Sequence, residues 1–158
     1  MPIRPARLPE DKPELLAFIE GMQRFEHAIE PDRRIDAGVA EEFFTDIFTR
    51  LAEKKGVAFI AEEGGEKLGW AAVYREQNDV YVRADEREFA YISELYVVEP
   101  ARGTGVGRAL VAACEEWARS LPVTVLMINV LEGNQRAATI YRKAGFATYY
   151  VGLRKYLR

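Results

Sequence analysis

The sequence has little cysteine and little histidine: one of each, Cys114 and His27, in 158 residues. A single cysteine excludes a disulfide within the chain, and so few thiol and imidazole groups leave no cluster with zinc-ligand spacing. We therefore expect no metal site. The longest uncharged apolar run, VTVLMINVL at 123–131, is far shorter than the ~20 residues that cross a bilayer. The N-terminal residues MPIRPARLPEDK lack the layout of a signal peptide, so we expect a cytoplasmic protein with no membrane partner.

Length and composition fit a single globular domain over residues 1–158. Hydrophobic residues make up 49% of the chain and charged residues 30%, which supplies enough apolar material for a core and argues against disorder. No internal repeat or low-complexity segment interrupts the chain. We therefore analyse the sequence as one folding unit.

Charge is distributed unevenly along the chain. Residues 10–42 carry ten acids and four bases, a balance of −6, whereas residues 99–158 carry nine bases and four acids, a balance of +5. One interpretation is that both sets of charges are solvated surface. The other is that they bind ligands, with an anion docking on the C-terminal half and a cation on the N-terminal half. The net charge of −3 and the lack of a basic stripe with interleaved aromatic residues argue against a nucleic-acid partner.

Hydrophobic periodicity predicts the order of the secondary-structure elements. We expect, in chain order, a strand at Pro2–Arg7, a helix opened by Pro9-Glu10-Asp11, a helix over 39–55, strands Val57–Glu62 and Leu68–Glu76 joined at Gly64-Gly65, a strand at Phe89–Val98, a helix to about Arg119, a strand at Val123–Leu131, a helix from about Asn134 to Ala144, and two short strands at Ala147–Val151 and Leu153–Leu157. Asp79–Arg83 extends or follows the third strand. This order, βααβββαβαββ, predicts an α/β domain with a mixed, mostly antiparallel sheet flanked by helices.

The segment RGTGVGR at 102–108 stands between a predicted strand and a predicted helix. Three glycines in five positions weaken both elements, so the backbone itself must be needed there. Such a turn offers unpaired N–H groups at the positive end of a helix, and Arg102 and Arg108 add charge at its two rims, which suits a diphosphate. No Lys-Ser/Thr follows, as a Walker A loop requires, and the dinucleotide fingerprint G-x-G-x-x-G is absent. A simple tight turn is the alternative.

Two motifs resemble those of the GNAT superfamily of N-acetyltransferases (Gcn5-related N-acetyltransferases). ELYVVEP at 94–100 followed by RGTGVG at 102–107 is similar to the acyl-CoA signature R/Q-x-x-G-x-G/A. Asn134 to Phe146 is similar to the second motif, N-x-x-A-x-x-x-Y-x-x-x-G-F, in the expected order and at the expected separation. The element order resembles the GNAT fold over the whole chain, while residues 9–56 match only in pattern. The resemblance implies a GNAT fold and acetyl-CoA as cosubstrate.

The resemblance also implies which residues bind acetyl-CoA. The pyrophosphate would be held by backbone amides of Gly103, Thr104, Gly105, Val106 and Gly107, with Arg102 and Arg108 near its charges. The pantetheine arm would bond to the backbone at Leu95, Tyr96 and Val97, where the fourth and fifth strands of this family separate. Asn134 would contact the pantetheine, cap the helix that follows it, or do both.

Amine attack on a thioester needs a base for the ammonium proton and an acid for the departing thiolate. By its place in the second motif, Tyr141 resembles the family's general acid, although an aromatic residue on a buried helix face is the alternative. Glu94 is our candidate base, since a carboxylate in an apolar strand needs a reason. The alternatives are that Glu94 faces solvent or that water takes the proton. His27 is expected at the surface and Cys114 in helix packing.

The acceptor is predicted only from charge and from the segment between the first two helices, which is long enough to cover a pocket. In the resembled family the first two helices and their connection wall the acceptor pocket, and here that stretch holds Glu26, Glu30 and Asp32, while Asp85, Glu86 and Glu88 precede the fourth strand. If these acids line the pocket, with Glu26 and Glu30 as substrate-binding residues, the acceptor is a small cationic amine of the polyamine or aminoglycoside type. A solvated acidic loop is the alternative.

Other functions and the assembly state stay open at this point. A protein or peptide N-acetyltransferase, or a non-catalytic module that binds acyl-CoA as a regulatory ligand, fits the same motifs. The resemblance implies that the terminal strands predicted at Ala147–Val151 and Leu153–Leu157 pair or exchange between two copies, as often happens in this family, so we expect a homodimer.

Overall fold

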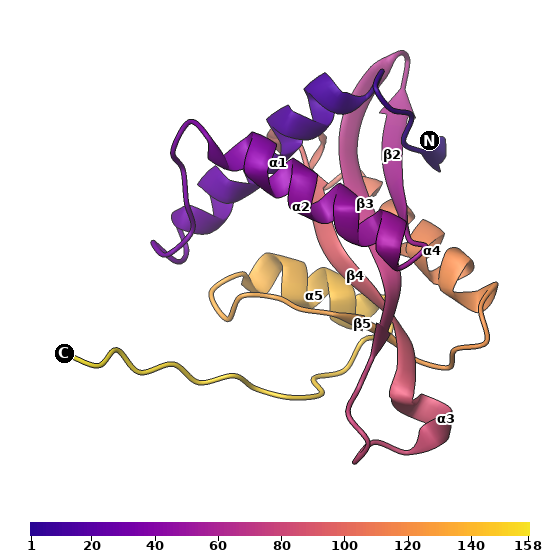
Figure 1. Cartoon of the computed structure of the whole chain (residues 1–158). Coiled ribbons are helices and arrows are strands. Elements are labelled where there is room, and N and C mark those ends of the chain that lie inside the picture. The colour runs from indigo at the N-terminus through magenta and orange to yellow at the C-terminus, as the bar shows by residue number, and fades with distance from the viewer.

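The computed structural model describes all residues, 1–158, as a five-stranded sheet with helices on both faces (Figure 1). The sheet order is β1-β2-β3-β4-β5, the first four strands are antiparallel, and β5 runs parallel to β4. The elements are β1 (Ile3–Pro5), α1 (Lys12–His27), α2 (Val39–Glu53), β2 (Val57–Glu63), β3 (Glu66–Gln77), α3 (Ala84–Arg87), β4 (Glu88–Val97), a 3₁₀ turn (Glu99–Ala101), α4 (Val106–Arg119), β5 (Leu126–Ile128) and α5 (Gln135–Lys143). The predicted α/β class with a mixed, mostly antiparallel sheet is confirmed.

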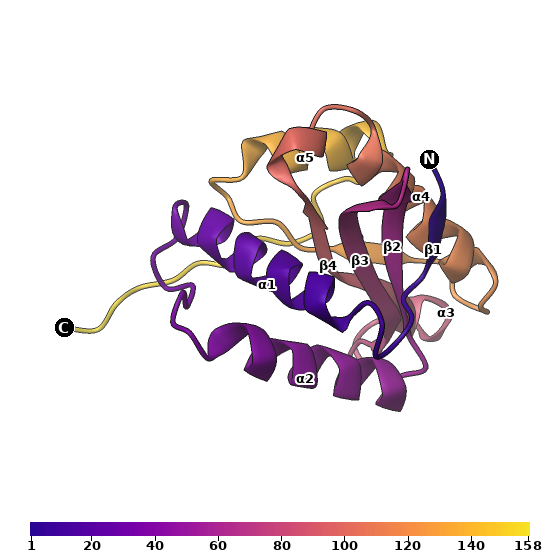
Figure 2. The ribbon, with the colours of Figure 1, turned by 90° about the horizontal axis from the view of Figure 1, so that it is seen from above.

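Two hydrophobic clusters hold the layers together. Helices α1 and α2 cover one face of the sheet, and α4 and α5 lie on the other (Figure 2). The first cluster packs Leu15 of α1 and Ile47 of α2 against Trp70 of β3, and the second packs Leu110 of α4 against Ile92 of β4. The alternating strand pattern sends successive side chains to opposite faces, so β2, β3 and β4 contribute to both clusters.

Strand β4 is irregular at its middle, and this positions the site described below. Its pairing with β3 runs from Glu88 to Ile92 and resumes at Glu94, which leaves Ser93 as the extra residue of a β-bulge. Pairing with β5 covers only Ala90–Ile92, although β4 continues to Val97. Beyond the bulge β4 therefore keeps one paired edge, toward β3, and one free edge.

The C-terminal part of the chain departs from our prediction. The strand expected at Val123–Leu131 is formed only at Leu126–Ile128, where β4 lies alongside to pair with it. The strands predicted at Ala147–Val151 and Leu153–Leu157 are absent, and that prediction was wrong. The residues have strand-type composition, but strands exist only in pairs, and these residues find no backbone partner within the chain.

The connection between β3 and β4 also differs in detail. Asp79–Arg83 is a turn rather than a strand, and the short helix α3 follows it. The Arg87 guanidinium donates to the carbonyl oxygens of Val80 and Val82 at 3.0–3.2 Å. A side chain therefore supplies the hydrogen bonds that a neighbouring strand would otherwise donate to these carbonyls. None of the helices combines the length and the apolar character needed to cross a bilayer.

Candidate active site

The glycine loop forms an anion cradle at the start of α4. Gly103 and Gly105 have φ angles of 82° and 97°, in the left-handed region that glycine adopts without steric cost. None of the N–H groups from Gly103 to Arg108 donates to a backbone carbonyl, and the Thr104 hydroxyl instead donates to the Ala101 carbonyl at 2.6 Å. A row of free amides at a helix N-terminus is a binding site for phosphate oxygens. The geometry predicted for the loop is therefore present.

Two arginines flank this cradle, and one of them is not the arginine that the sequence suggested. A guanidinium nitrogen of Arg108 lies 3.8 Å from the point that a β-carbon on Gly105 would occupy, and one of Arg136 lies 3.5 Å from the corresponding point on Gly103. Arg136 belongs to the first turn of α5, so its positive charge reaches the glycine loop from the α5 side. Sequence reasoning missed it, although its place two residues after Asn134 was a usable signal.

Arg102 faces away from the cradle. Its Nε donates to the Val97 carbonyl at 3.0 Å, and its guanidinium lies 4.7 Å from the Phe25 ring centroid and 5.6 Å from that of Tyr96. A cation over aromatic faces and bonded to a carbonyl is held in place by two independent contacts. In this conformation Arg102 ties β4 to the end of α1, and its place near the charges of the pyrophosphate stays a prediction.

The free edge of β4 lies next to the cradle. Leu95, Tyr96 and Val97 pair with β3 on one side and have no strand on the other. The Tyr96 side chain also has a packing role that the sequence did not indicate: its hydroxyl fills the notch at Gly21 of α1, where a β-carbon would come within 2.4 Å. Asn134 caps α5, because its Oδ1 accepts from the Ala137 N–H at 3.2 Å. The capping role is thus observed, and a contact with pantetheine stays a prediction.

Glu94 follows the bulge and is half-buried on the α1/α2 side of the sheet. Burial raises the pKa of its carboxyl group to about 8, the charge of Glu26 adds to the increase, and Arg50 opposes it. A carboxylate with a pKa close to neutral pH is suited to accept and release a proton. The Ser93 hydroxyl beside it is buried without a hydrogen-bond partner.

Tyr141 lies on the inner face of α5 and is 8% exposed. Burial raises the pKa of its hydroxyl group to about 12, with the charge of Glu26 as the second cause, so the phenol keeps its proton at neutral pH. The same Glu26 carboxylate therefore acts on Glu94 of β4 and on Tyr141 of α5. Glu26 of α1 is thus near enough to raise the pKa of both groups, and the roles of Glu94 as base and Tyr141 as acid stay predictions.

Most of the acids expected at the pocket pair with arginines. Glu26 pairs with Arg33 at 3.0 Å, while Glu30 and Asp32 both pair with Arg154, at 2.8 and 2.6 Å. Of the acids before β4, Asp85 pairs with Arg83, and Glu88 pairs with Arg75. Among these acids, only Glu26 contributes to the raised pKa of both Glu94 and Tyr141, and an acidic acceptor pocket stays a prediction.

His27 and Cys114 have structural roles. His27 Nδ1 donates to the Arg33 carbonyl at 2.7 Å and so fixes the turn after α1. Cys114 is fully buried in the cluster under α4, and burial raises the pKa of its thiol to about 12. A thiol that stays protonated and has no access to solvent is not a nucleophile.

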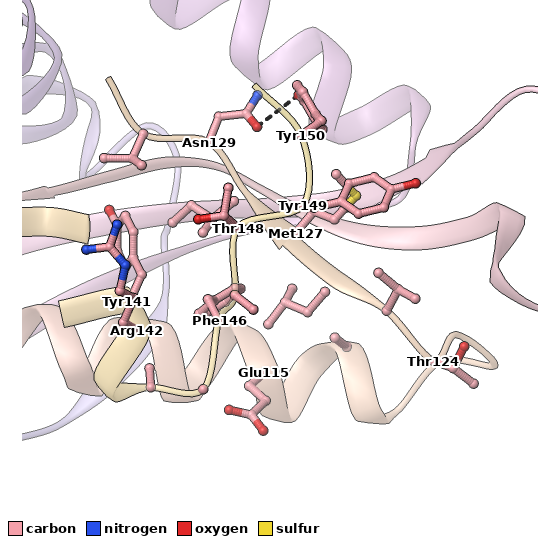
Figure 3. Close-up of a pocket in the computed structure, with 18 of the residues that line it drawn as sticks. Glu115, Thr124, Met127, Asn129, Tyr141, Arg142, Phe146, Thr148, Tyr149 and Tyr150 are labelled. Carbon is pink, nitrogen blue, oxygen red and sulfur yellow. Dashed lines mark hydrogen bonds between the residues drawn. The ribbon is translucent and has the colours of Figure 1, made fainter. Parts of the chain in front are cut away.

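A polar and aromatic chain that the sequence did not reveal extends from β3 to the C-terminal residues. Tyr74 and Tyr91 meet edge to face at 5.6 Å, the Asn129 amide donates to the Tyr91 hydroxyl at 3.0 Å, and the Tyr150 hydroxyl donates to Asn129 Oδ1 at 3.1 Å. Figure 3 shows the last of these bonds at the rim of a groove of about 980 Å³ between β5 and residues 146–152. Contacts between residues this far apart along the chain leave no local pattern in the sequence from which they could be predicted.

Comparison with known proteins gives one consistent family. The model of the acetyltransferase (GNAT) family matches residues 17–146. The N-acetyltransferase YdgE of Bacillus subtilis (strain 168) is 30% identical over 98 residues, which cover 62% of this chain and 59% of that protein. An aminoglycoside N(6')-acetyltransferase type 1 from Stenotrophomonas maltophilia is 29% identical over 108 residues, which cover 68% of this chain and 70% of that protein.

A solved structure reproduces the fold over its full length. The tetramutant of the BH1408 protein from Bacillus halodurans has a TM-score of 0.82 at 20% identity, covering 99% of this chain and 100% of that one. The sequence alignment to YdgE spans less than two thirds of that relative. The structural match to the BH1408 protein covers nearly the whole of both chains.

Proposed function

The chain belongs to the GNAT family of acetyltransferases, and from this premise we propose that it moves the acetyl group of acetyl-CoA to the primary amine of a small cationic acceptor. The observation that carries the proposal is that the charge of Glu26 in α1 adds to the raised pKa of both Glu94 in β4 and Tyr141 in α5, two groups already shifted by burial. In this proposal the Glu26 carboxylate attracts the acceptor ammonium, the Glu94 carboxyl group has a pKa close to neutral pH, and the Tyr141 phenol keeps its proton.

Acetyl-CoA, the donor of this family, fits the residues on both sides of β4. The free amides from Gly103 to Arg108 suit the diphosphate, and the guanidinium groups of Arg108 and Arg136 supply its counter-charge. The unpaired edge at Leu95–Val97 offers backbone donors and acceptors to the amide groups of the pantetheine arm, in the manner of an added strand. When bound, the donor supplies a thioester as the activated acetyl group.

The protein residues then have separate tasks in the transfer. Glu94 accepts the proton of the acceptor ammonium, which frees the nitrogen lone pair to bond to the acetyl carbon. The carbon–sulfur bond breaks, and Tyr141 gives its proton to the departing sulfur. The second proton, which the nitrogen loses as it becomes an amide, returns through solvent to the Tyr141 oxygen and restores the phenol. Glu94 in its ionised form, and Glu26 where its ion pair with Arg33 opens, attract a positively charged acceptor before the reaction. Glu30 contributes to this attraction only where its ion pair with Arg154 opens.

A small cationic acceptor is supported by two observations. The acids that face the site lie on the α1 side, whereas the cationic residues Arg108 and Arg136 lie at the glycine loop, so the two ligands meet walls of opposite charge. Among the relatives, one is an aminoglycoside N(6')-acetyltransferase, an enzyme whose name states a polycationic amine acceptor.

Thiol release from acetyl-CoA tests this proposal. The protein is incubated with acetyl-CoA and a panel of polyamines, aminoglycosides, amino acids and short basic peptides, and the free thiol is followed with a thiol-reactive dye. We expect release with at least one small amine, and loss of that release in Glu94→Gln and Tyr141→Phe. Matched controls are Glu66→Gln and Tyr81→Phe, which change exposed residues of the same types.

The same panel separates the alternatives. Release only with peptides would replace the small amine by a protein or peptide acceptor. No release with any acceptor, together with calorimetric binding of acetyl-CoA, would contradict an enzyme and favour a module that binds acyl-CoA as a ligand.

A further inference from the structure

Tyr91 is the side chain next to Glu94 on the α1/α2 face of the sheet. In the pairing of β3 with β4, Tyr91 lies opposite Tyr74 and Glu94 lies opposite Ala72, and both β3 residues belong to the cluster under α1 and α2. Tyr91 and Glu94 therefore share that face, because the bulge between them absorbs one residue. Their backbones lie about two strand residues apart, roughly 7 Å. The free edge at Leu95–Val97, where the donor is proposed to bind, lies on the other side of Glu94.

A directed chain of hydrogen bonds holds the Tyr91 hydroxyl group. The Tyr150 hydroxyl donates to Asn129 Oδ1 at 3.1 Å (Figure 3), and Asn129 Nδ2 donates to the Tyr91 hydroxyl oxygen at 3.0 Å. The two bonds use both ends of the amide, so the orientation of the amide is fixed and the Tyr91 oxygen receives a hydrogen bond. The Tyr91 ring is held as well, edge to face against Tyr74 at 5.6 Å. The hydroxyl hydrogen of Tyr91 stays free, since no group of the chain accepts it.

This hydrogen is available to a ligand beside the proposed base. Tyr91 is half-buried, and its partners Asn129 and Tyr150 are exposed, so a small molecule can reach the hydroxyl group. Burial raises the pKa of that hydroxyl to about 12, and the charges of Tyr74 and Glu94 add to the increase, so it stays protonated at neutral pH. A donor that gains its partner only from an oxygen on the ligand discriminates between ligands with and without that oxygen.

Among the oxygens of the proposed reaction, one on the amine substrate fits this donor. The thioester is expected alongside Leu95–Val97, on the far side of Glu94 from Tyr91, and the Glu94 carboxyl group makes no hydrogen bond with Tyr91. The nitrogen of the substrate must come to Glu94 to lose its proton. A nitrogen and an oxygen that are two or three carbon atoms apart, with a hydrogen bond at each end, span the roughly 7 Å between the two positions.

We propose that Tyr91 determines which amine is acetylated, because its hydroxyl donates a hydrogen bond to an oxygen of the substrate. The preferred substrate is then a primary amine with a hydroxyl or ether oxygen two or three carbon atoms from the nitrogen, as in amino alcohols and aminosugars. Asn129 and Tyr150 act through Tyr91, as positioning residues that keep its hydrogen free. A simple alkyl amine or polyamine leaves that hydrogen without a partner. This inference rests on the proposed function, since it concerns the substrate of that reaction.

Binding of matched amines to the full chain, with and without CoA, tests the inference. The pairs are 2-aminoethanol with propylamine and 3-aminopropan-1-ol with butylamine, which differ only by a hydroxyl in place of a methyl group, and NMR titration gives each dissociation constant. We expect the wild type to prefer the hydroxylated member by roughly tenfold in at least one pair, the usual value of one net hydrogen bond.

Tyr91→Phe should weaken binding of the hydroxylated amine to the level of its isostere and leave the isostere unchanged. Damage to the structure alone would weaken both amines, so the ratio of the two dissociation constants separates a specific role from a structural one. Tyr81→Phe, at an exposed tyrosine in the turn before α3, is the matched control and should keep the wild-type preference.

Asn129→Asp tests the direction of the hydrogen bonds with Tyr91 left in place. The carboxylate has the shape of the amide but donates nothing, so it accepts the Tyr91 hydrogen as well as that of Tyr150. We expect the preference for the hydroxylated amine to disappear, as in Tyr91→Phe. The added negative charge attracts both members of a pair equally, so it leaves the ratio of their dissociation constants unchanged.

Three results would overturn the proposal: equal affinity of the wild type for both members of each pair, a preference that survives Tyr91→Phe or Asn129→Asp, or no binding of any of the four amines. None of these measurements needs acetyl transfer. Thiol release without a preference would leave the proposed activity standing and remove Tyr91 from substrate selection. A preference without thiol release would leave the role of Tyr91 in binding and contradict the proposed activity.

Discussion

The pH dependence of acetyl transfer should report the ionisation of Glu94, and Glu26→Gln should move it. With the Glu94 pKa at about 8, about a tenth of the carboxyl group is ionised at pH 7 and about nine tenths at pH 9. Only the ionised form accepts a proton, so kcat/KM should rise about tenfold between these values and then level off. Glu94→Gln should lower the rate at pH 9 by ~10²-fold or more, the usual contribution of a general base.

Replacing Glu26 removes a negative charge that raises the pKa of Glu94. A single charge in a partly solvated site is worth ~1 kcal/mol, which corresponds to ~0.7 pH unit. The midpoint should therefore fall by at least about half a unit in Glu26→Gln. It should stay above the ordinary value of 4.5, because burial is the larger cause of the shift.

The assay is kcat/KM for acetyl-CoA with a saturating amine from pH 6 to pH 10. The acceptor ammonium titrates equally in every variant, so the difference between enzymes isolates Glu94. Glu20→Gln on the same helix, an exposed residue paired with Arg24, is the matched control and should leave the midpoint unchanged. A midpoint that stays in place in Glu26→Gln, or a flat profile in the wild type, would refute the role of Glu94 as base.

Three further outcomes follow from the same site. Tyr141→Phe should lower kcat by ~10- to 100-fold and leave the calorimetric affinity for acetyl-CoA unchanged, since only the acid is lost; an unchanged kcat would remove Tyr141 from the mechanism. Arg136→Ala should weaken acetyl-CoA binding by about tenfold or more, as a charged hydrogen bond to phosphate is lost, whereas Arg119→Ala at the far end of α4 should not. Glu94→Gln should be more stable than the wild type in urea at pH 9 and equally stable at pH 4: the pKa is higher in the folded protein, so wild-type stability falls as pH rises from 4.5 through about 8, by up to ~1.4 kcal/mol per unit. Equal stability of the two at pH 9 would contradict a buried carboxyl group.

The elements with strong local patterns could be predicted from the sequence, and those that depend on partners could not. Helix α2 was expected to begin at residue 39 and does, since its apolar stripe and the following Gly56 are local signals. Strand β5 is shorter than predicted, because an apolar run becomes strand only where a neighbour pairs with it. The terminal strands failed for the same reason: residues 147–158 have strand composition without a partner in the chain.

For the site, motif spacing located the positions but not their geometry. The loop has the left-handed glycines Gly103 and Gly105 at the turn where the sequence places them, whereas the roles of Glu94, Glu26 and Tyr141 stay predictions. The direction of the Arg102 side chain was not predictable, because it depends on Phe25, 77 positions away along the chain. Ion pairing of Glu30 with Arg154 joins still more distant residues. Charge counts along a sequence reveal how many acids are present and say nothing of which are already neutralised.

The bulge in β4 has a consequence for how this protein can change over generations. The strand meets its two proposed ligands through different chemistry: the donor through main-chain groups at its free edge, and the acceptor through side chains such as Glu94. Main-chain groups are the same in all residues except proline, so most substitutions on this strand preserve the backbone hydrogen bonds proposed for acetyl-CoA. Acceptor preference can thus drift by ordinary point mutation in α1, α2 and the outward face of β4, while the capacity to use the donor is inherited intact.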